Sequence, residues 1–281
     1  MVRFFLQWAL ILLSFSIESA NVSVTDDLNR TITLEEPPGR IISLAPHLTE
    51  ILFRLGVGDK IIGTVSFSDY PEEAKLITRL GDSSSVNIEQ ILAFSPDLIV
   101  AWLSGGTFQS SKTLIDRGMV VYVNEPKAIE HVASTFARLG ALVGKPEKGN
   151  RLSREFLRKI SDLRQPSTHA RQSVFFQIGD QDLFTVNDKH FVGQAIEICG
   201  AENVFADISS QASLVSFESV IRANPDIIIL AEPVHEKQSI WSKRWKDLGW
   251  AHKLKSLDAS EISRPTYRFA NGVKKLCALL R

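Results

Sequence analysis

Short apolar runs alternate with amphipathic helical patterns through the first half of this chain. Four runs have the length and composition of buried strands, at 40–45, 60–66, 97–102 and 120–123. Helical patterns separate them, at 47–55, 88–94 and 112–117. An earlier segment, 22–34, alternates on both sides of Asp26-Asp27-Leu28-Asn29 and predicts a hairpin. This βαβ order is typical of a largely parallel sheet.

The pattern then becomes helical from 128 to 164, and Gly144-Lys145-Pro146 divides this stretch into two helices. The strand pattern resumes at 173–178. We therefore predict an α/β protein with two similar lobes, mainly parallel sheets and a long helix that joins the lobes. The predicted boundaries are 21–144 for the N-terminal lobe, 145–166 for the connecting helix and 167–281 for the C-terminal lobe.

An internal echo supports this duplication. Segment 87–100 recurs at 216–229, an offset of 129 residues, with a matched Glu, Pro and Asp in each copy. Each copy predicts a capped helix that leads through Pro-Asp into a buried strand. A looser echo pairs 55–61 with 199–205. The sequence therefore predicts two lobes built alike.

The first 20 residues predict a signal peptide. Arg3 precedes an apolar run over 4–15, and small residues follow up to Ala20. The run is too short for a membrane span, which needs about 20 apolar residues. We expect cleavage near Ala20, or a few residues earlier because Glu18 occupies a position where a small residue is preferred. The mature protein is therefore predicted to be exported.

Charge, cysteine and histidine content bear on the binding partners, on a disulfide and on a metal site. Lys plus Arg equals Asp plus Glu at 32 each, so no net charge favours nucleic acid or an anionic membrane. Cys199 and Cys277 are an even pair in an exported chain, which favours a disulfide over two buried thiols. The six histidines are scattered without metal-ligand spacing, so no metal site is predicted.

Catalytic motifs are missing from the sequence. It contains no Gly-x-Ser-x-Gly elbow, no phosphate-binding Gly-rich loop and no His-Glu-x-x-His pair. Gly56-Val57-Gly58 follows a helix and is interpreted as a helix C-cap and turn rather than a dinucleotide loop. An exported two-lobed hydrolase or transferase remains a weaker alternative, because no nucleophile with a base can be named.

Three aromatic residues lie at predicted strand exits. Phe67 and Trp102 follow strands of the first lobe, and Phe184 lies in a predicted loop after 173–178. Ligands of two-lobed α/β proteins bind outside the carboxyl ends of parallel strands. Each residue alone could simply pack in the core. Together they favour a flat or apolar ligand held by stacking in a cleft between the lobes.

Several segments resemble the periplasmic binding proteins for metal chelates, and the resemblance covers the whole mature chain. The segments are Val24-Thr25-Asp26-Asp27, Arg40-Ile41-Ile42-Ser43-Leu44-Ala45-Pro46, Ser68-Asp69-Tyr70-Pro71 and Pro96-Asp97-Leu98-Ile99-Val100-Ala101-Trp102. Segment 197–205 and Lys275-Leu276-Cys277 are similar to those that flank the disulfide in the cobalamin-carrying branch of that family. The chain is therefore most similar to that branch.

This resemblance implies a class III fold with a rigid helical backbone and a corrinoid bound between the lobes. It also implies a periplasmic monomer without catalysis or a cofactor of its own, which delivers cobalamin to the permease dimer of an ABC importer. Trp102 and Phe184 match aromatic ligand contacts, Phe67 replaces a tyrosine contact, and Arg264 matches a basic residue of the cleft. Ser83 and Ala212 replace tryptophans, so a carrier of haem or a ferric siderophore remains the alternative.

Glu89 and Glu218, the acidic pair of the echo, match glutamates that dock on the permease in the cobalamin branch. Each follows a helix cap, Asn87 or Ser216, by two residues. A carboxylate in the first turn also stabilises a helix through its dipole, by about 0.3–1 kcal/mol. Both a docking role and a purely structural role are therefore open for this pair.

Overall fold

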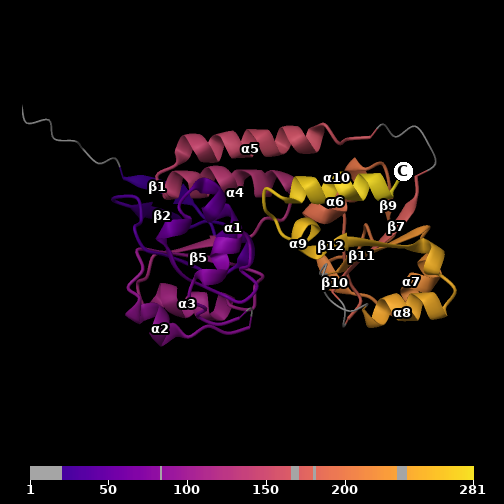
Figure 1. Ribbon diagram of the computed structural model, residues 1–281, viewed down its shortest axis with the longest axis horizontal. Coiled ribbons are helices and arrows are strands. Elements are labelled where there is room, and N and C mark those ends of the chain that lie inside the picture. Colours follow the sequence, from indigo (N-terminus) through magenta and orange to yellow (C-terminus); the bar gives the residue numbers. More distant parts are fainter. Residues whose placement is uncertain (1–20, 83, 166–170, 180–181, 233–238) are drawn as a thin grey trace, which may run out of the picture.

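The computed structural model describes residues 21–82, 84–165, 171–179, 182–232 and 239–281. The predicted signal peptide lies outside these residues. Two lobes, each built around one sheet, lie next to each other along the long axis of the molecule (Figure 1). Three helices, α4 (Ile129–Leu142), α5 (Pro146–Ser161) and α10 (Phe269–Leu279), lie along the upper side of the molecule in this view.

The first lobe contains a four-stranded parallel sheet in the order β4-β3-β5-β6. Its strands are β3 (Ile41–Ser43), β4 (Ile61–Thr64), β5 (Leu98–Trp102) and β6 (Val121–Asn124). Its helices are α1 (Pro46–Leu55), α2 (Ile88–Ala93) and α3 (Phe108–Asp116), with 3-10 turns at Gly58–Lys60 and Glu72–Leu76. The antiparallel hairpin of β1 (Val22–Thr25) and β2 (Thr31–Leu34) precedes them, as predicted.

The second lobe contains a six-stranded sheet in which β7, β9, β11 and β12 are parallel, β8 pairs antiparallel with β7, and β10 pairs antiparallel with β8. Its strands are β7 (Ser173–Ile178), β8 (Phe184–Val186), β9 (Glu202–Asn203), β10 (Ala212–Leu214), β11 (Ile227–Glu232) and β12 (Leu254–Asp258). Its helices are α6 (Phe191–Ile198), α7 (Phe217–Ala223), α8 (Ile240–Asp247), α9 (Ala259–Ile262) and α10 (Phe269–Leu279), with a 3-10 turn at Ala251–Lys253.

The internal echo corresponds to a repeated structure. The parallel strands follow the same order in both sheets, β4-β3-β5-β6 and β9-β7-β11-β12. Asp97 Oδ2 accepts backbone hydrogen bonds from Gly39 and Arg40, both at 2.8 Å, just before β3. Asp226 Oδ2 accepts from the backbone N and the Oγ of Ser173, also at 2.8 Å, where β7 begins. The matched aspartates therefore fix the start of the neighbouring strand in each lobe.

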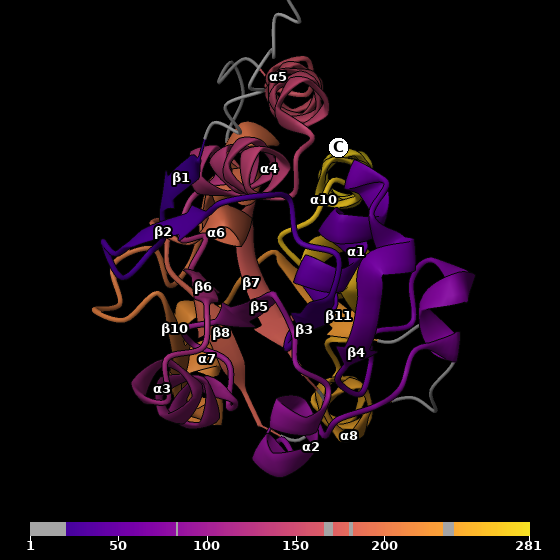
Figure 2. The same ribbon diagram turned by 90° about the vertical axis from the view of Figure 1, so that its left-hand side faces the viewer.

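Two antiparallel helices make the crossing between the lobes, α4 (Ile129–Leu142) and α5 (Pro146–Ser161). Seen along the long axis, they lie one above the other outside the sheets (Figure 2). Their backbones touch, because a Cβ added at Gly149 would lie 2.4 Å from the Phe136 carbonyl oxygen and 2.9 Å from the Gly140 Cα. The second helix ends at Ser161, a few residues before the end of the predicted helical stretch.

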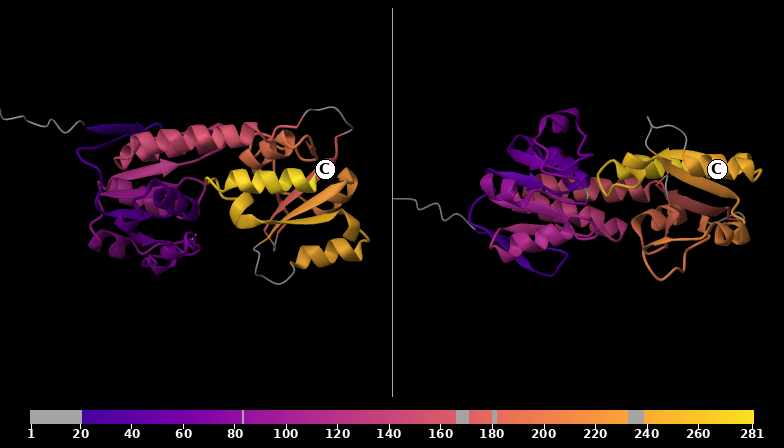
Figure 3. Two further views of the ribbon diagram at one scale, coloured as in Figure 1. Left: turned by 45° about the horizontal axis from the view of Figure 1, so that its top comes forward. Right: turned by 90° about the horizontal axis from the view of Figure 1, so that it is seen from below.

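One apolar core continues through the junction. Phe136 of α4 packs edge-on against Phe156 of α5 at 5.4 Å between ring centroids. Phe156 meets Phe269 of α10 at 6.4 Å, and Phe269 meets Phe191 of α6 at 5.0 Å. These four rings are almost completely buried and belong to one cluster that includes residues of both lobes. Figure 3 shows α5 running from the first lobe to this junction.

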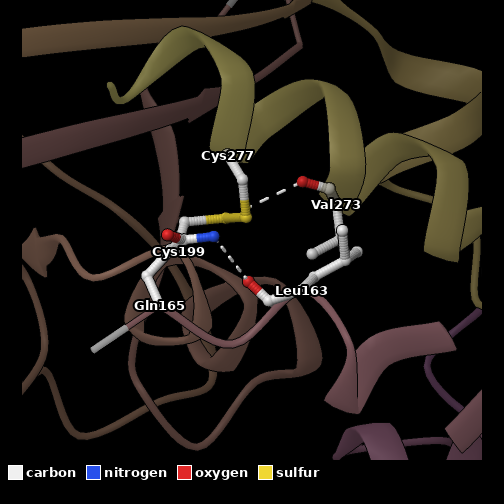
Figure 4. Close-up of a disulfide and its surroundings, with 5 residues drawn as sticks. All are labelled: Leu163, Gln165, Cys199, Val273 and Cys277. Atoms are coloured by element: carbon white, nitrogen blue, oxygen red, sulfur yellow. Dashed lines mark hydrogen bonds between the residues drawn. A yellow bond between two sulfur atoms is a disulfide. The ribbon is translucent and has the colours of Figure 1, made fainter. Parts of the chain in front are cut away.

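Cys199 and Cys277 form a disulfide, as predicted. Cys199 is the C-terminal cap of α6, and Cys277 lies in α10, so the bond attaches the last helix to the second lobe (Figure 4). Both residues are buried. In the part of the chain that the structure describes, no helix is both long and apolar enough to cross a bilayer.

The disulfide closes a loop with a sequence separation of 78 residues. Replacing both cysteines by alanine should lower the free energy of unfolding by about 4 kcal/mol, because the cross-link no longer restricts the unfolded chain. Urea denaturation of C199A/C277A against wild type measures this, and wild type under a reducing agent should shift in the same direction. An unchanged midpoint in both samples would contradict the expectation.

Candidate ligand-binding cleft

The carboxyl ends of the parallel strands in both lobes border the space between the lobes. In the first lobe, Leu44 follows β3, Trp102 ends β5 and Glu125 follows β6. In the second lobe, Ile178 ends β7 and borders the same space. Strand ends of this kind are where open α/β sheets bind ligands, because the connecting loops leave room there. The interlobe cleft is therefore the candidate site.

Two adjoining cavities make up the cleft, with volumes of ≈ 540 Å³ and ≈ 290 Å³. The larger alone lies within the range of about 300–1,000 Å³ that ligand pockets occupy. The cavities share four lining residues: Trp102, Ser104, Ser263 and Pro265. The first two come from the first lobe and the last two from the segment between α9 and α10. Both lobes therefore contribute to a single elongated site.

Trp102 stands at the centre of this site, as the strand-exit pattern predicted. It is half-buried and lines both cavities. The His47 ring packs edge-on against it, with centroids 5.4 Å apart and an interplanar angle of 85°. Ser104, two residues further on, donates from its backbone N and Oγ to the carboxylate of Glu125 at 2.9 and 2.6 Å. The His47 ring therefore supports the indole, and Glu125 fixes the loop that follows it.

His47 is a neutral support for this tryptophan. It is buried, and burial lowers its pKa to about 4, while its hydrogen bond to Asn124 has a smaller opposing effect. Asn124 Nδ2 donates to Thr135 at 2.9 Å and to Asp27 at 3.1 Å, which leaves its Oδ1 as the acceptor for His47 Nε2 at 3.1 Å. The proton of the imidazole therefore resides on Nε2.

The other two predicted aromatic residues line one cavity each. Phe67 lines the smaller cavity, is 68% exposed, and has a positive φ of 64° that a bulky side chain rarely adopts. Phe184 lines the larger cavity and is 39% exposed. The prediction that Phe184 lies in a loop is wrong, because its backbone pairs with Ile178 and Leu214 and begins β8. Phe184 therefore projects from a sheet, where strand pairing on both sides fixes its backbone.

Arg264 borders the smaller cavity, but its terminal nitrogens are already engaged. Nη1 donates to Glu50 and to Asp69, both at 2.9 Å, and Nη2 donates to the Phe67 carbonyl at 3.1 Å. All three partners belong to the first lobe. Arg264 therefore links the lobes next to the cleft, a contact that the sequence did not predict.

Of the two positions where tryptophans are replaced, Ser83 lies outside the described residues. Ala212 begins β10, is exposed and lines the larger cavity. Its methyl group occupies little of the space that an indole would fill at that position. Only this one of the two departures can thus be placed at the cleft.

Sequence reasoning missed several polar residues of the larger cavity: Glu125, Lys127, His190 and Gln211. Glu125 and Lys127 follow β6 directly, so the strand-exit argument used for Trp102 could have found them. His190 caps α6, since its Nδ1 accepts from the Val192 backbone N at 3.2 Å, and burial lowers its pKa to about 4. These residues give the cavity polar groups along an apolar wall.

Glu89 and Glu218 lie away from the cleft, at matching places in α2 and α7. Both are exposed, and these helices lie on the side of each lobe opposite α5 (Figure 1). The predicted caps are confirmed, because Asn87 Oδ1 accepts from Gln90 N at 3.0 Å and Ser216 Oγ accepts from Ser219 N at 3.1 Å. Glu89 makes a long surface ion pair of 3.4 Å with Arg117.

Comparison with known proteins identifies the family. A family model described as periplasmic binding protein matches residues 41–245. The chain belongs to the periplasmic binding protein family. A protein of Vibrio campbellii named vitamin B12-binding protein is 32% identical over 246 residues, which cover 86% of this chain and 89% of that one.

Two solved structures extend the comparison. The periplasmic vitamin B12 binding protein BtuF of Vibrio cholerae is 30% identical, with a TM-score of 0.76 over 87% of this chain and 97% of that one. A protein of Staphylococcus epidermidis titled a possible iron-binding, periplasmic solute-binding protein is 31% identical, with a TM-score of 0.71 over 86% and 98%. These similarities confirm the class III fold expected from the sequence.

The neutral His47 has a consequence for stability. Its pKa is about 4 in the folded protein against 6.5 in the unfolded chain, so only the unfolded chain takes up a proton between these values. The stabilisation is present above pH 6.5 and is lost as the pH falls towards 4. The contribution of His47 should make the free energy of unfolding about 2–3 kcal/mol lower at pH 4.5 than at pH 7.5.

Urea denaturation of wild type and His47→Gln at both pH values measures this contribution. The variant should lose less stability on acidification than wild type, because its side chain does not titrate. His252→Gln, at an exposed histidine, is the control and should keep the wild-type difference. Equal pH dependence in His47→Gln and wild type would show that His47 is not held neutral.

Proposed function

We propose that this protein captures cobalamin in the interlobe cleft and delivers it to an ABC importer. The observation that carries the proposal is the convergence of Trp102 and Phe67 from one lobe and Phe184 from the other on one site. The relatives named vitamin B12-binding proteins match most of the chain, and their names support the proposal of cobalamin as the ligand. A binding protein without catalytic turnover fits both observations better than an exported hydrolase or transferase.

In this proposal the aromatic side chains stack on the apolar parts of the corrinoid. Each such contact contributes about 0.5–1.5 kcal/mol beyond the buried area. The amide-rich periphery would meet the polar groups of the larger cavity, such as Glu125, Lys127 and Gln211. Contact between Arg264 and the ligand remains a prediction, and any such contact would share a guanidinium already bonded to the first lobe.

An iron chelate, haem or a ferric siderophore, is the second candidate. The Staphylococcus epidermidis neighbour titled possible iron-binding is as similar in sequence as the vitamin B12-binding relatives. The small Ala212 side chain at the larger cavity is compatible with a ligand of different outline. Both candidates are flat or compact metal chelates with an apolar surface, so the same cleft residues would serve either.

The family and the predicted signal peptide support a periplasmic location, and we propose that the protein acts as a monomer. For delivery we assign Glu89 and Glu218 to contacts with the permease. They lie at equivalent positions of the two repeats, on exposed first turns away from the cleft. Two carboxylates related in this way suit a twofold-symmetric partner with basic groups.

Trp102→Ala should weaken cyanocobalamin binding by more than about tenfold, because a central stacking surface and its buried area are lost. Quenching of tryptophan fluorescence during titration measures the dissociation constant. Trp250→Ala is the matched control, since that indole stacks on Trp245 outside the cavities. An unchanged dissociation constant in Trp102→Ala would reject the site. Parallel titrations with haemin and a ferric siderophore, followed by visible absorbance, distinguish the two candidates.

Changing Glu89 and Glu218 together to Lys should abolish complex formation with a solubilised vitamin B12 importer. Loss of desolvated charge contacts costs roughly 2–5 kcal/mol for each partner removed. Cyanocobalamin affinity should stay within about twofold, because neither residue lines the cleft. Glu147→Lys in α5 with Asp162→Lys at the C-terminal cap of α5, both exposed, makes the same charge change elsewhere. Wild-type assembly by the Glu89/Glu218 variant would limit this pair to stabilising its helices.

A further inference from the structure

A cluster of buried charges joins the lobes beside the cleft. Glu50 of α1 accepts hydrogen bonds from two arginines of the second lobe. Arg268 forms a fork, with Nε 2.9 Å from Oε2 and Nη2 2.8 Å from Oε1 of Glu50. Arg264 Nη1 donates to the same Oε1 at 2.9 Å and to Asp69 at 2.9 Å. Two cations thus meet two anions across the interface.

Burial makes this cluster stronger than a surface ion pair. The side chains of Glu50, Arg264 and Arg268 are 3%, 19% and 17% exposed. Water therefore screens these charges little. The planar guanidinium of Arg268 also lies over the Tyr70 ring, 3.9 Å from its centroid, which adds a cation–π contact. All these contacts reach the first lobe through α1 and the 67–70 segment, so they form an attachment separate from α4 and α5.

The same cluster holds the segment that presents Phe67. Arg264 Nη2 donates to the Phe67 carbonyl from the second lobe. From the first lobe, Ser68 Oγ accepts from Thr64 Oγ1 at 2.8 Å, and Arg79 Nη2 donates to the Ser68 carbonyl at 2.8 Å. Phe67 itself has a positive φ, and these hydrogen bonds hold its carbonyl and the next residue in place. An unfavourable backbone conformation of this kind persists where its surroundings determine it.

Glu50 itself does not line either cavity, whereas Phe67 and Arg264 do. We propose that Glu50, through Arg264 and Arg268, is a positioning residue that fixes the width of the cleft and the placement of Phe67. Its carboxylate bridges two arginines that would otherwise repel each other at the interface, and Asp69 supplies the second negative charge. Without it the lobes separate more widely and Phe67 loses the orientation that the second lobe imposes.

The lobe arrangement can be measured without any ligand. Spin labels at Lys112→Cys on α3 and Lys243→Cys on α8, both exposed, report the interlobe distance distribution, and the disulfide leaves no other thiol to label. Glu50→Gln should broaden this distribution or move it to longer distances. Glu50→Asp, which keeps the charge, should restore it in part. Glu72→Gln breaks an exposed ion pair with Lys75 in the first lobe and should leave it unchanged.

A second measurement addresses ligand retention and rests on the proposed function. Cyanocobalamin should dissociate from Glu50→Gln about tenfold faster than from wild type, and at the wild-type rate from Glu72→Gln. If wild type binds no cyanocobalamin, the proposed function fails, while the distance measurement still tests the role of Glu50. Asp69→Asn, at the half-exposed end of the cluster, serves if Glu50→Gln does not fold, and should shift the distances in the same direction.

A folded Glu50→Gln protein with the wild-type distance distribution would overturn the proposal. So would equal changes in Glu50→Gln and Glu72→Gln, since these would not be specific to the buried cluster. Circular dichroism and thermal unfolding of each variant establish that the folded state is being compared.

Discussion

The apolar core that passes from one lobe to the other is the constraint on which the rest of this structure depends. The rings of Phe136, Phe156, Phe269 and Phe191 connect α4, α5, α10 and α6 without a polar gap. Burial of such rings contributes several kcal/mol, and interiors of this packing density resist deformation. The core therefore holds the lobes next to each other, with the ends of their strands on either side of the cleft.

Polar groups refine what the core establishes. The Glu50 cluster adds a second attachment on a different element, and two attachments restrict rotation more than one does. His47 supports Trp102 because it is buried and neutral, and its tautomer is set by Asn124. Around the cleft, the buried ion pairs therefore connect the two lobes, while aromatic side chains line the cavities.

The repeat explains why both lobes contribute comparable parts. Asp97 and Asp226 occupy equivalent places and tie the start of the adjacent strand, so the strands of each sheet keep the same register. The same duplication places Glu89 and Glu218 on equivalent first turns. The repeated arrangement thus brings strand ends from both lobes to the cleft and gives each lobe an exposed carboxylate at an equivalent place.

The sequence by itself predicted the elements of the first lobe, the two helices after it, strand β7 and the repeated helix and strand α7–β11, because these follow from local periodicity and caps. It also predicted the disulfide from the cysteine count and the position of Trp102 at a strand exit. It misplaced Phe184, since pairing with Ile178 and Leu214 depends on strands distant in sequence. It could not reveal the Glu50 cluster, whose partners lie 214 and 218 residues away. Only tertiary structure decides such contacts, because long-range charge pairing leaves no periodic signal and forms only after the shared core has brought the lobes together.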